Sequence, residues 1–336
     1  MTDTIDVPPA ITMLEMATGF QVSQALYAAA ELDIAGSVVE RPRTVAELAD
    51  ATDANPDALG RLIRFLESVG VFRFNDGIVE VTDLGEVLAD GVPGSARGII
   101  RYWMATHYAP YGDLMHTIRT GEPAATHYLG KPFFDWISER PAMVELQNAG
   151  MVSGGEALRE AALAEYVLPG DGTAADIGGA DGNILSRLLA AQPERHGIVF
   201  DLPDVVEGAH AKLRDAGLTD RVEVVGGDFF DAVPIAEVYV MSSVLHDWSD
   251  ADAIRILTTV ARAAPRGARL VLLELVVPED ASPHYTKSVD VTMMTMVGGR
   301  ERTATEWREL LDAGGFRLDG IIEHPAAFSI IEATVR

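Results

Sequence analysis

One histidine stands where it could accept a proton from a bound ligand. His246 follows the apolar run "VYVMSSVL" and precedes the polar residues "DWSD". The run predicts a buried strand, and the sequence after Trp248 has helical periodicity. His246 is therefore expected where a strand ends and a helix begins, which is where open α/β sheets bind their ligands. A neutral imidazole, with an ordinary pKa of about 6.5, is suited to general-base catalysis.

Two glutamates are candidates to orient this imidazole. Glu274 interrupts the apolar run "LVLLELVVP", and a carboxylate is costly to bury there without a partner such as His246. Glu301, in "GGRERT", lies between Arg300 and Arg302, so a plain ion pair is the alternative. Either glutamate could fix the tautomer of the ring and stabilise the imidazolium that forms when the base takes a proton.

A glycine-rich turn precedes this region. The segment "DIGGADGN" joins a predicted strand to a predicted helix, and Gly178 opens the turn. Glycine lets the backbone turn tightly and lets a ligand approach the start of the helix. The dinucleotide pattern G-x-G-x-x-G is not in register here. Asp181 would also repel a pyrophosphate, whereas a cationic ligand would tolerate it.

Polar and aromatic residues follow the next strands. Asp201 ends the second strand of the alternating region, where an acid can accept hydrogen bonds from both ribose hydroxyls. Asp228 ends the third strand and could reach an adenine edge, while Phe229 and Trp248 could sandwich a purine. Singly, each acid could be a cap or turn residue. Together they predict a cofactor that contains a nucleoside.

Other chemistries find little support. The chain has no cysteine, which excludes thiolate metal sites and a cysteine nucleophile. His107, His116 and His127 do not have the spacing of metal ligands, so no metal is expected. No nucleophile motif of the G-x-S-x-G type is present.

The elements that would position these residues form an α/β fold. From residue 173 onward, strands alternate with helices, which predicts a doubly wound, mostly parallel sheet with an antiparallel end. Residues 11–35 predict an amphipathic helix. Residues 44–81 predict helix, turn, helix and hairpin, with Thr44 as the first helix cap, which is a winged-helix pattern. Residues 97–165 are helical and rich in aromatic residues and methionine, typical of a core or of the wall of an apolar pocket.

Three parts follow from this pattern. They are a winged-helix-like dimerisation domain, a helical connector that forms a pocket wall, and a cofactor-binding catalytic domain, over residues 1–96, 97–165 and 166–336.

Charge and hydropathy limit the partners. The formal net charge is −25 over 336 residues, so nucleic acid and anionic lipid are not expected to bind. The would-be recognition helix pairs Arg61 and Arg64 with Asp57 and Glu67, leaving no basic face, which favours dimerisation over DNA binding. No apolar run is long enough to span a membrane, and no basic leader is visible, so a cytoplasmic location is expected.

Six segments, in order, resemble a known family. "DIGGADG", "FDLPDVV", "GGDFF", "VLHDWSD", "LELVVP" and "GGRERTATEWRELLDAGGF" are similar to the dimeric small-molecule O-methyltransferases of plant phenylpropanoid and bacterial aromatic polyketide pathways. The resemblance covers nearly the whole chain. It implies a Rossmann-like methyltransferase sheet, S-adenosylmethionine as cofactor, a small aromatic substrate and a homodimer formed through the N-terminal domain.

The resemblance also assigns roles to residues. It implies His246 as general base, flanked by Glu274 and Glu301, and Met151 and Met293 as residues that clamp a planar substrate. Cofactor contacts are implied at five positions: Gly178, Asp201, Asp228, Phe229 and Trp248.

Three residues depart from the family pattern. Ser242 stands where plant members have lysine, although its hydroxyl can still contact the cofactor, and bacterial members resemble this version. Ala180 replaces a common glycine. Thr292 replaces an asparagine that many bacterial relatives place against the substrate, which changes the hydrogen bonding expected there.

The predicted activity is methylation of a phenolic hydroxyl on an aromatic, polyketide-derived intermediate, with a carboxylate acceptor left open. One rival keeps the cofactor but performs hydroxylation, decarboxylation or pericyclic chemistry. The others are a winged-helix regulator that senses a small molecule and an NAD-dependent dehydrogenase.

Overall fold

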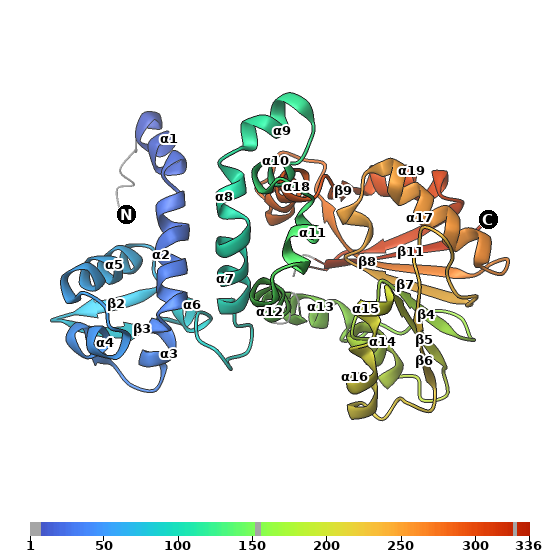
Figure 1. The fold of residues 1–336 in the computed structure, drawn as a ribbon, viewed down its shortest axis with the longest axis horizontal. Coiled ribbons are helices and arrows are strands. Elements are labelled where there is room, and N and C mark those ends of the chain that lie inside the picture. The colour runs from blue at the N-terminus through green and yellow to red at the C-terminus, as the bar shows by residue number, and fades with distance from the viewer. Residues whose placement is uncertain (1–7, 152–155, 325–327) are drawn as a thin grey trace, which may run out of the picture. The chain divides into compact units, whose positions relative to one another are not determined.

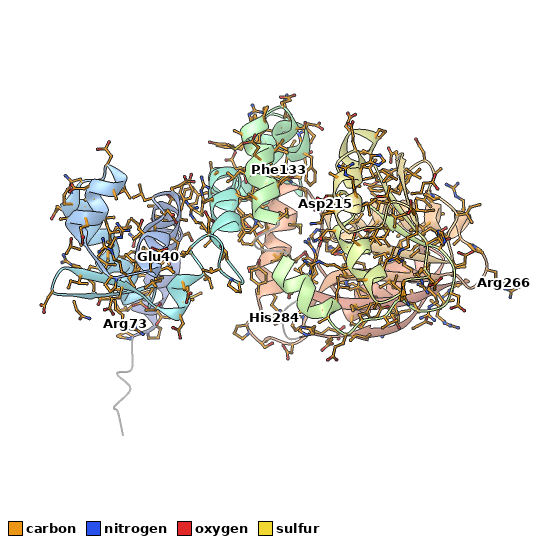
Figure 2. All side chains as sticks on the ribbon, turned by 90° about the horizontal axis from the view of Figure 1, so that it is seen from below. Glu40, Arg73, Phe133, Asp215, Arg266 and His284 are labelled. Atoms are coloured by element: carbon orange, nitrogen blue, oxygen red, sulfur yellow. The ribbon has the colours of Figure 1, made fainter. Side chains whose placement is uncertain are left out.

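The computed structural model describes residues 8–151, 156–324 and 328–336. The chain forms two compact units: Met1–Gly112 with Phe134–Ala157, and Asp113–Phe133 with Leu158–Arg336. Residues 97–165 are thus shared between the units. In both, charged side chains such as Glu40 and Arg266 are exposed, whereas Phe133 is buried (Figure 2). Among the described residues, no helix combines the length and apolarity needed to cross a membrane.

The N-terminal helical region is interrupted, so the prediction of one helix over residues 11–35 was wrong. It consists of α1 (Pro9–Ala17), α2 (Phe20–Glu31) and α3 (Ile34–Val39). The first break lies at Thr18, whose hydroxyl bonds back to the carbonyl of Leu14 at 2.8 Å. The second lies at Asp33, whose φ of 50° is left-handed and ends a right-handed helix.

The winged-helix pattern is confirmed in the first unit. Thr44 and Glu47 form a reciprocal capping box at the start of α4. Asp76 and Gly77 both have positive φ, 49° and 80°, as a two-residue hairpin turn requires. The elements in order are β1 (Arg43–Thr44), α4 (Val45–Thr52), α5 (Pro56–Ser68), β2 (Phe72–Asn75), β3 (Ile78–Val81) and α6 (Asp83–Glu86). Helices α7 (Arg97–Thr106), α8 (Tyr108–Tyr111) and α12 (Pro141–Gly150) also lie in this unit.

The second unit is built on one mixed sheet with strand order β10-β11-β8-β7-β4-β5-β6, and β9 pairs with the end of β8. Strands β4 to β8 are parallel, and β10 and β11 are antiparallel. The doubly wound sheet and its antiparallel end are therefore confirmed, although β10 was not predicted. The bounds are β4 Ala174–Ile177, β5 Gly197–Asp201, β6 Val222–Gly226, β7 Val238–Ser242, β8 Arg269–Val277, β9 Arg302–Thr303, β10 Phe316–Ile322 and β11 Phe328–Val335.

Helices cover both faces of this sheet (Figure 1). One apolar cluster joins the sheet to α14 (Asn183–Ala190) and α16 (Ala209–Asp215), and the other joins it to α17 (Asp250–Ala263) and α19 (Ala304–Ala313). Strand β7 is buried along almost its whole length because it packs on both faces. The other helices of the second unit are α9 (Leu114–Thr120), α10 (Ala124–Leu129), α15 (Pro203–Val206) and α18 (Tyr285–Met296). Helix α11 (Phe133–Ser138) belongs to the first unit except for Phe133, and α13 (Glu156–Leu163) is divided between the two units after Ala157.

Candidate active site

The predicted base lies where the sequence indicated. Strand β7 ends at Ser242, Ser243 adopts a left-handed φ of 53°, and a short 3-10 turn contains His246. Ser249 then caps α17 by accepting a hydrogen bond from the Asp252 amide. We refer to residues 243–248 as the base loop. The side chain of His246 is 15% exposed, so the ring is shielded but still accessible.

Glu301 orients the imidazole directly. Its Oε1 lies 2.7 Å from Nδ1 of His246, and its side chain is fully buried. The other ring nitrogen, Nε2, lies 3.5 Å from Oδ1 of Asp247. A tetrahedral metal ion about 2.0 Å from both Nδ1 and Oε1 would hold these atoms about 3.3 Å apart, so the shorter contact is a hydrogen bond. A carboxylate at Nδ1 fixes the tautomer in which Nε2 can accept a proton.

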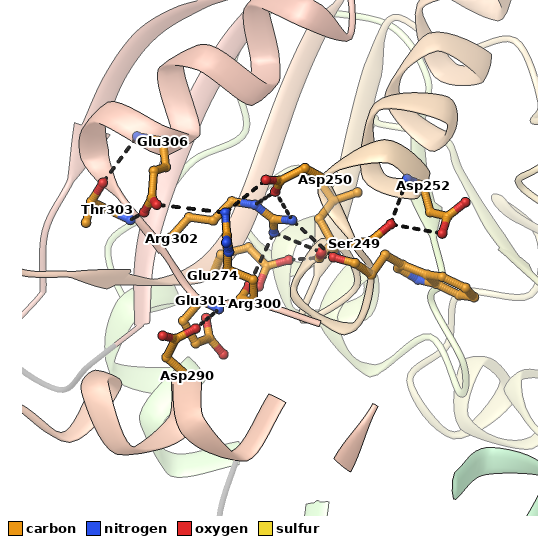
Figure 3. A network of polar contacts seen from close by, with 12 residues as sticks. Ser249, Asp250, Asp252, Glu274, Asp290, Arg300, Glu301, Arg302, Thr303 and Glu306 are labelled. Atoms are coloured by element: carbon orange, nitrogen blue, oxygen red, sulfur yellow. Dashed lines mark hydrogen bonds and ion pairs between the residues drawn. The ribbon is translucent and has the colours of Figure 1, made fainter. Parts of the chain in front are cut away.

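The ion pair considered for Glu301 does not form. Both arginines bind the carboxylate of Asp250 instead (Figure 3). Nη1 of Arg300 donates to Oδ2 of Asp250 at 2.9 Å, and Nε and Nη2 of Arg302 donate to Oδ1 of Asp250 at 3.1 and 2.9 Å. The Glu301 amide donates to Asp290 at 3.0 Å. These contacts leave the Glu301 carboxylate directed to His246.

Glu274, the other acid expected to flank the base, hydrogen-bonds to backbone amides and not to the ring. Its Oε1 accepts hydrogen bonds from the amides of Val244 and Leu245, at 3.1 and 3.0 Å. The reason is its register on β8, opposite the turn that follows β7, where two amides point at one carboxylate. Glu274 still lies near the ring, because it shares a cluster with His246 and Glu301 whose nearest polar atoms lie within 4.8 Å of one another. Through its hydrogen bonds to the amides of Val244 and Leu245, Glu274 holds the backbone of the base loop.

The carboxylates make His246 a stronger base than free imidazole. Burial disfavours the imidazolium, but the charges of Asp247, Glu274 and Glu301 outweigh it and raise the pKa of His246 to about 10. Burial also raises the pKa of Glu274 to about 7. A ring with such neighbours binds its proton firmly in the resting protein, and its basicity is close to that of a phenolate.

The glycine loop, residues 178–182, lies at the same edge of the sheet. Gly178, Ala180 and Gly182 have positive φ, and Ala180 adopts 45° although alanine has a Cβ. Asp201 holds this loop, since its Oδ2 accepts the Ala180 amide at 3.0 Å. A Cβ on Gly178 would lie 2.7 Å from a methyl of Val244, so the glycine loop touches the base loop.

The aromatic residues near Asp228 do not form a sandwich as they stand. The rings of Phe229 and Trp248 are 5.9 Å apart and nearly perpendicular, at 88°. Phe230, which the sequence analysis did not single out, also meets Trp248 edge-on at 4.8 Å. Asp228 accepts the Phe230 amide at 2.8 Å and fixes this turn. A purine between Phe229 and Trp248 would require one ring to rotate.

Several buried polar atoms at this edge have no hydrogen-bond partner. They are Oδ2 of Asp176, Oγ of Ser242 and the Oε2 atoms of Glu274 and Glu301. Such atoms are rare in folded proteins and indicate a site where a ligand or water completes the hydrogen bonds. Burial raises the pKa of Asp176 to about 7. The edge thus offers hydroxyl and carboxyl acceptors, which suits a ligand rich in donors and positive charge.

The predicted substrate residues are divided between the units. Thr292 and Met293 lie on α18, where Met293 packs beside Leu275 and Phe328. The Thr292 hydroxyl bonds back to the carbonyl of Ser288 at 3.1 Å. Met151 follows α12 in the first unit and is 38% exposed. The geometry of the base and of the cofactor edge therefore comes from the second unit alone.

Sequence reasoning missed the contacts that three charged residues make beside the predicted site. Arg159 donates to Oγ of Ser243 at 3.2 Å and lies over the Phe328 ring. Asp250 and Arg302 form the ion pair described above. Arginines on either side of Glu301 were visible in "GGRERT", but their common partner depends on the fold.

Gly299 tests how closely the base loop is packed. A Cβ at this position would overlap the carbonyl of His246 and lie 2.6 Å from the carbonyl carbon of Asp247. Gly299→Ala is therefore expected to displace the base loop and to lower kcat at least about tenfold, while overpacking lowers stability by about 1–3 kcal/mol. Initial rates and thermal unfolding measure both effects. Gly320→Ala, on β10 with open space at its Cβ, is the matched control, and equal rates for the two variants would contradict this packing.

This fold and site define a methyltransferase-type enzyme, and family models agree. The O-methyltransferase domain matches residues 111–317, and the O-methyltransferase dimerisation domain matches residues 14–91. The chain therefore belongs to the O-methyltransferase family, an enzyme class that uses S-adenosylmethionine as methyl donor. The dehydrogenase and regulator alternatives are set aside.

Curated relatives cover almost the full chain. The phenazine O-methyltransferase PhzM of Lysobacter antibioticus is 37% identical over 97% of this chain and 96% of its own length. The O-demethylpuromycin-O-methyltransferase of Streptomyces alboniger is 38% identical over 96% of this chain and 88% of its own. The aclacinomycin 10-hydroxylase RdmB of Streptomyces purpurascens is 34% identical over 92% of this chain and 86% of its own.

Solved structures share the fold. LaPhzM superposes with a TM-score of 0.89 at 36% identity, covering 98% of this chain and 100% of its own. NcsB1, an O-methyltransferase from neocarzinostatin biosynthesis solved with S-adenosylmethionine and 2-hydroxy-5-methyl naphthoic acid, has a TM-score of 0.80 at 33% identity. The match covers 94% of this chain and 96% of NcsB1.

Proposed function

We propose that the protein methylates a phenolic hydroxyl of a flat aromatic natural-product intermediate, with His246 as general base. The observation that carries the proposal is the 2.7 Å contact between Nδ1 of His246 and Glu301 at the carboxyl edge of the sheet. The protein belongs to a family of O-methyltransferases, and a base oriented in this way is what an unactivated hydroxyl requires.

The residues at the sheet edge fit S-adenosylmethionine. The cofactor supplies a methyl group that its sulfonium makes electrophilic. Asp201 would accept hydrogen bonds from the ribose hydroxyls. Each of its carboxylate oxygens already accepts one backbone amide and has a second lone pair for a further hydrogen bond. The buried acceptors on Asp176 and Ser242 suit an ammonium group, and the Arg159 guanidinium suits a carboxylate. Gly178, Asp228, Phe229 and Trp248 would complete the cofactor site.

The proton is moved by this chain's own residues. Nε2 of His246 would take the hydroxyl proton of the acceptor as its oxygen attacks, and Glu301 would stabilise the imidazolium. A phenol has a pKa near 10, which matches the raised pKa of His246, so the transfer costs little free energy. His246 then loses the proton to solvent before the next turnover.

This proton balance predicts the pH dependence. The free enzyme must lose the His246 proton before it can accept one, and the pKa of that proton is raised to about 10. We therefore expect kcat/KM to rise about tenfold per pH unit from pH 7 toward 9. Asp247→Asn removes one of the charges that raise this pKa, so the rising part of the kcat/KM profile (its acid limb) should move to lower pH. An acid limb of the wild-type profile with its midpoint near pH 6.5 would contradict the expected effect of the three carboxylates on the pKa of His246.

The names of relatives support a flat acceptor. They include enzymes named for phenazine, for 2,7-dihydroxy-5-methyl-1-naphthoate and for 3-amino-4-hydroxybenzoate. Thr292, Met293 and Met151 are each proposed to contact the substrate. Methionine suits this task because its flexible side chain adapts to planar ligands.

Incubation with methyl-labelled S-adenosylmethionine tests the proposed function. The acceptor panel should contain hydroxylated naphthoates, anthraquinones, phenazines and cinnamates, each paired with its O-methylated analogue as a blocked control. Label in a free phenol but not in its blocked analogue supports the proposal. Label that alkali releases as methanol would identify a carboxylate acceptor instead.

A second candidate keeps the cofactor without methyl transfer. It is motivated by the relative named aclacinomycin 10-hydroxylase, at 34% identity. Binding of S-adenosylmethionine without transfer to any acceptor would favour it. The oriented His246 favours methyl transfer, because a cofactor held only for its charge needs no base beside it.

We also propose a cytoplasmic homodimer, with residues 1–96, 97–165 and 166–336 as its dimerisation, connector and catalytic parts. The dimerisation-domain match supports the dimer, and so does an exposed apolar surface on α1 and α2. Met13, Leu14, Met16 and Phe20 are 52–72% exposed there. Apolar side chains clustered at this density are typical of a protein interface.

A further inference from the structure

Arg302 is a fully buried arginine whose donors are all used. Nε and Nη2 bind Oδ1 of Asp250, and Nη2 also binds the Trp248 carbonyl at 3.1 Å. Nη1 binds the carbonyls of Leu245 and Arg300, at 3.0 and 3.2 Å. These contacts account for all five N–H groups of a guanidinium. The guanidinium also lies 5.3 Å from the Trp307 ring centroid.

Its partners lie on both sides of the base. Leu245 precedes His246, and Trp248 follows it by two residues. One planar guanidinium therefore binds the backbone on both sides of His246. The His246 carbonyl is bound by the Arg300 amide at 2.8 Å. The chain from Gly299 to Arg302 thus holds the base loop through three of its carbonyls.

The same segment also sets the position of the orienting acid. Arg302 pairs with Val276 on β8, the strand that carries Glu274, and Glu301 is the residue before Arg302. The groups that face His246 are Glu301 from this segment, Glu274 from β8 and Asp247 from the base loop itself. A shift of Arg302 would therefore change the distance from Glu301 to Nδ1.

We infer that Arg302 is a positioning residue that sets the His246–Glu301 contact and the Trp248 wall of the cofactor site together. The inference rests on the proposed function of His246 and Trp248. Arg302 itself touches neither reacting group. It couples the two because its guanidinium binds backbone on both sides of His246, and the carbonyl of Trp248 is one of its acceptors.

A lysine cannot reproduce this arrangement. Its ammonium has three donors on a flexible stem, whereas the acceptors around Arg302 are disposed about one planar fork. Arg302→Lys keeps the charge beside Asp250 but leaves at least one of the four acceptors without a donor. The matched control is Arg300→Lys, because the Arg300 side chain binds the other oxygen of Asp250 and is 50% exposed.

The experiment measures two equilibrium properties that need no methyl transfer. The titration of His246 is followed by imidazole NMR, with the signal assigned by its loss in His246→Gln, and the Kd of S-adenosylhomocysteine by calorimetry. In Arg302→Lys we expect the His246 midpoint to fall by about one pH unit or more, because Glu301 is no longer held at Nδ1. We expect Kd to rise about tenfold, and both changes to be small in Arg300→Lys.

Unchanged midpoint and Kd in a folded Arg302→Lys would overturn the inference. If that variant does not fold, Asp250→Asn decides, since it weakens the anchor of the guanidinium at a side chain that is 49% exposed. It should move both readouts in the same directions, and no movement would again overturn the inference. Failure of the proposed function is distinguishable, because the wild type would then transfer no methyl group to any acceptor, whereas the His246 midpoint and the Kd are compared between variants without any transfer.

Discussion

His246→Ala is expected to lower kcat by a factor of about 10² to 10⁴ while it binds S-adenosylmethionine as tightly as the wild type. Loss of the ring removes the group that would take the hydroxyl proton, whereas Gly178, Asp201 and Asp228 remain. The ring is 15% exposed and at the edge of the core, so its removal leaves little void. Stopped-time assays with labelled cofactor give kcat, and calorimetry gives Kd.

His210→Ala is the matched control for this variant. His210 is exposed on α16, on the opposite face of the sheet, and its removal should leave both kcat and Kd at their wild-type values. Full activity in His246→Ala would show that another group, or the solvent, removes the proton. An assay at raised pH adds a second check, because an acceptor that is already ionised needs less help from a base.

Much of this site was predictable because it depends on order along the chain. Strand-helix alternation placed Gly178, Asp201, Asp228 and His246 after successive strands, and parallel strands bring such residues to one edge of a sheet. The Thr44 cap and the Asp76-Gly77 turn were equally local. Each of these rules needs only a few neighbouring residues.

What could not be predicted depends on register between distant strands. Glu274 binds backbone amides because β8 pairs beside β7, and nothing in the sequence distinguishes those amides from the imidazole as its partner. Arg302 reaches Leu245 and Trp248 across more than fifty residues of sequence. The prediction of one helix over residues 11–35 failed because periodicity does not show where a helix ends. One break lies at Thr18 and the other at Asp33, and only Asp33 is left-handed.

Glu301→Gln should cost far more activity than Glu274→Gln, although both remove a buried carboxylate from one cluster. The amide that replaces the Glu301 carboxylate can donate to Nδ1 of His246, which favours the tautomer with its proton on Nε2, where the base must be free. Loss of an orienting carboxylate of this kind costs up to roughly 10⁴ in kcat. The lost charge also lowers the pKa of His246, so the acid limb of kcat/KM should move to lower pH.

Glu274→Gln keeps the contact that the structure gives to Glu274. An amide oxygen can still accept the hydrogen bonds of Val244 and Leu245, and a neutral group is less costly to bury than a carboxylate. We therefore expect a loss of kcat below about tenfold, with the acid limb again at lower pH because a negative charge near His246 is gone. The pH profiles of both variants, fitted for limiting rate and midpoint, separate orientation from charge. If the two limiting rates fall equally, Glu301 acts through its charge alone, and the hydrogen bond to Nδ1 does not decide the tautomer.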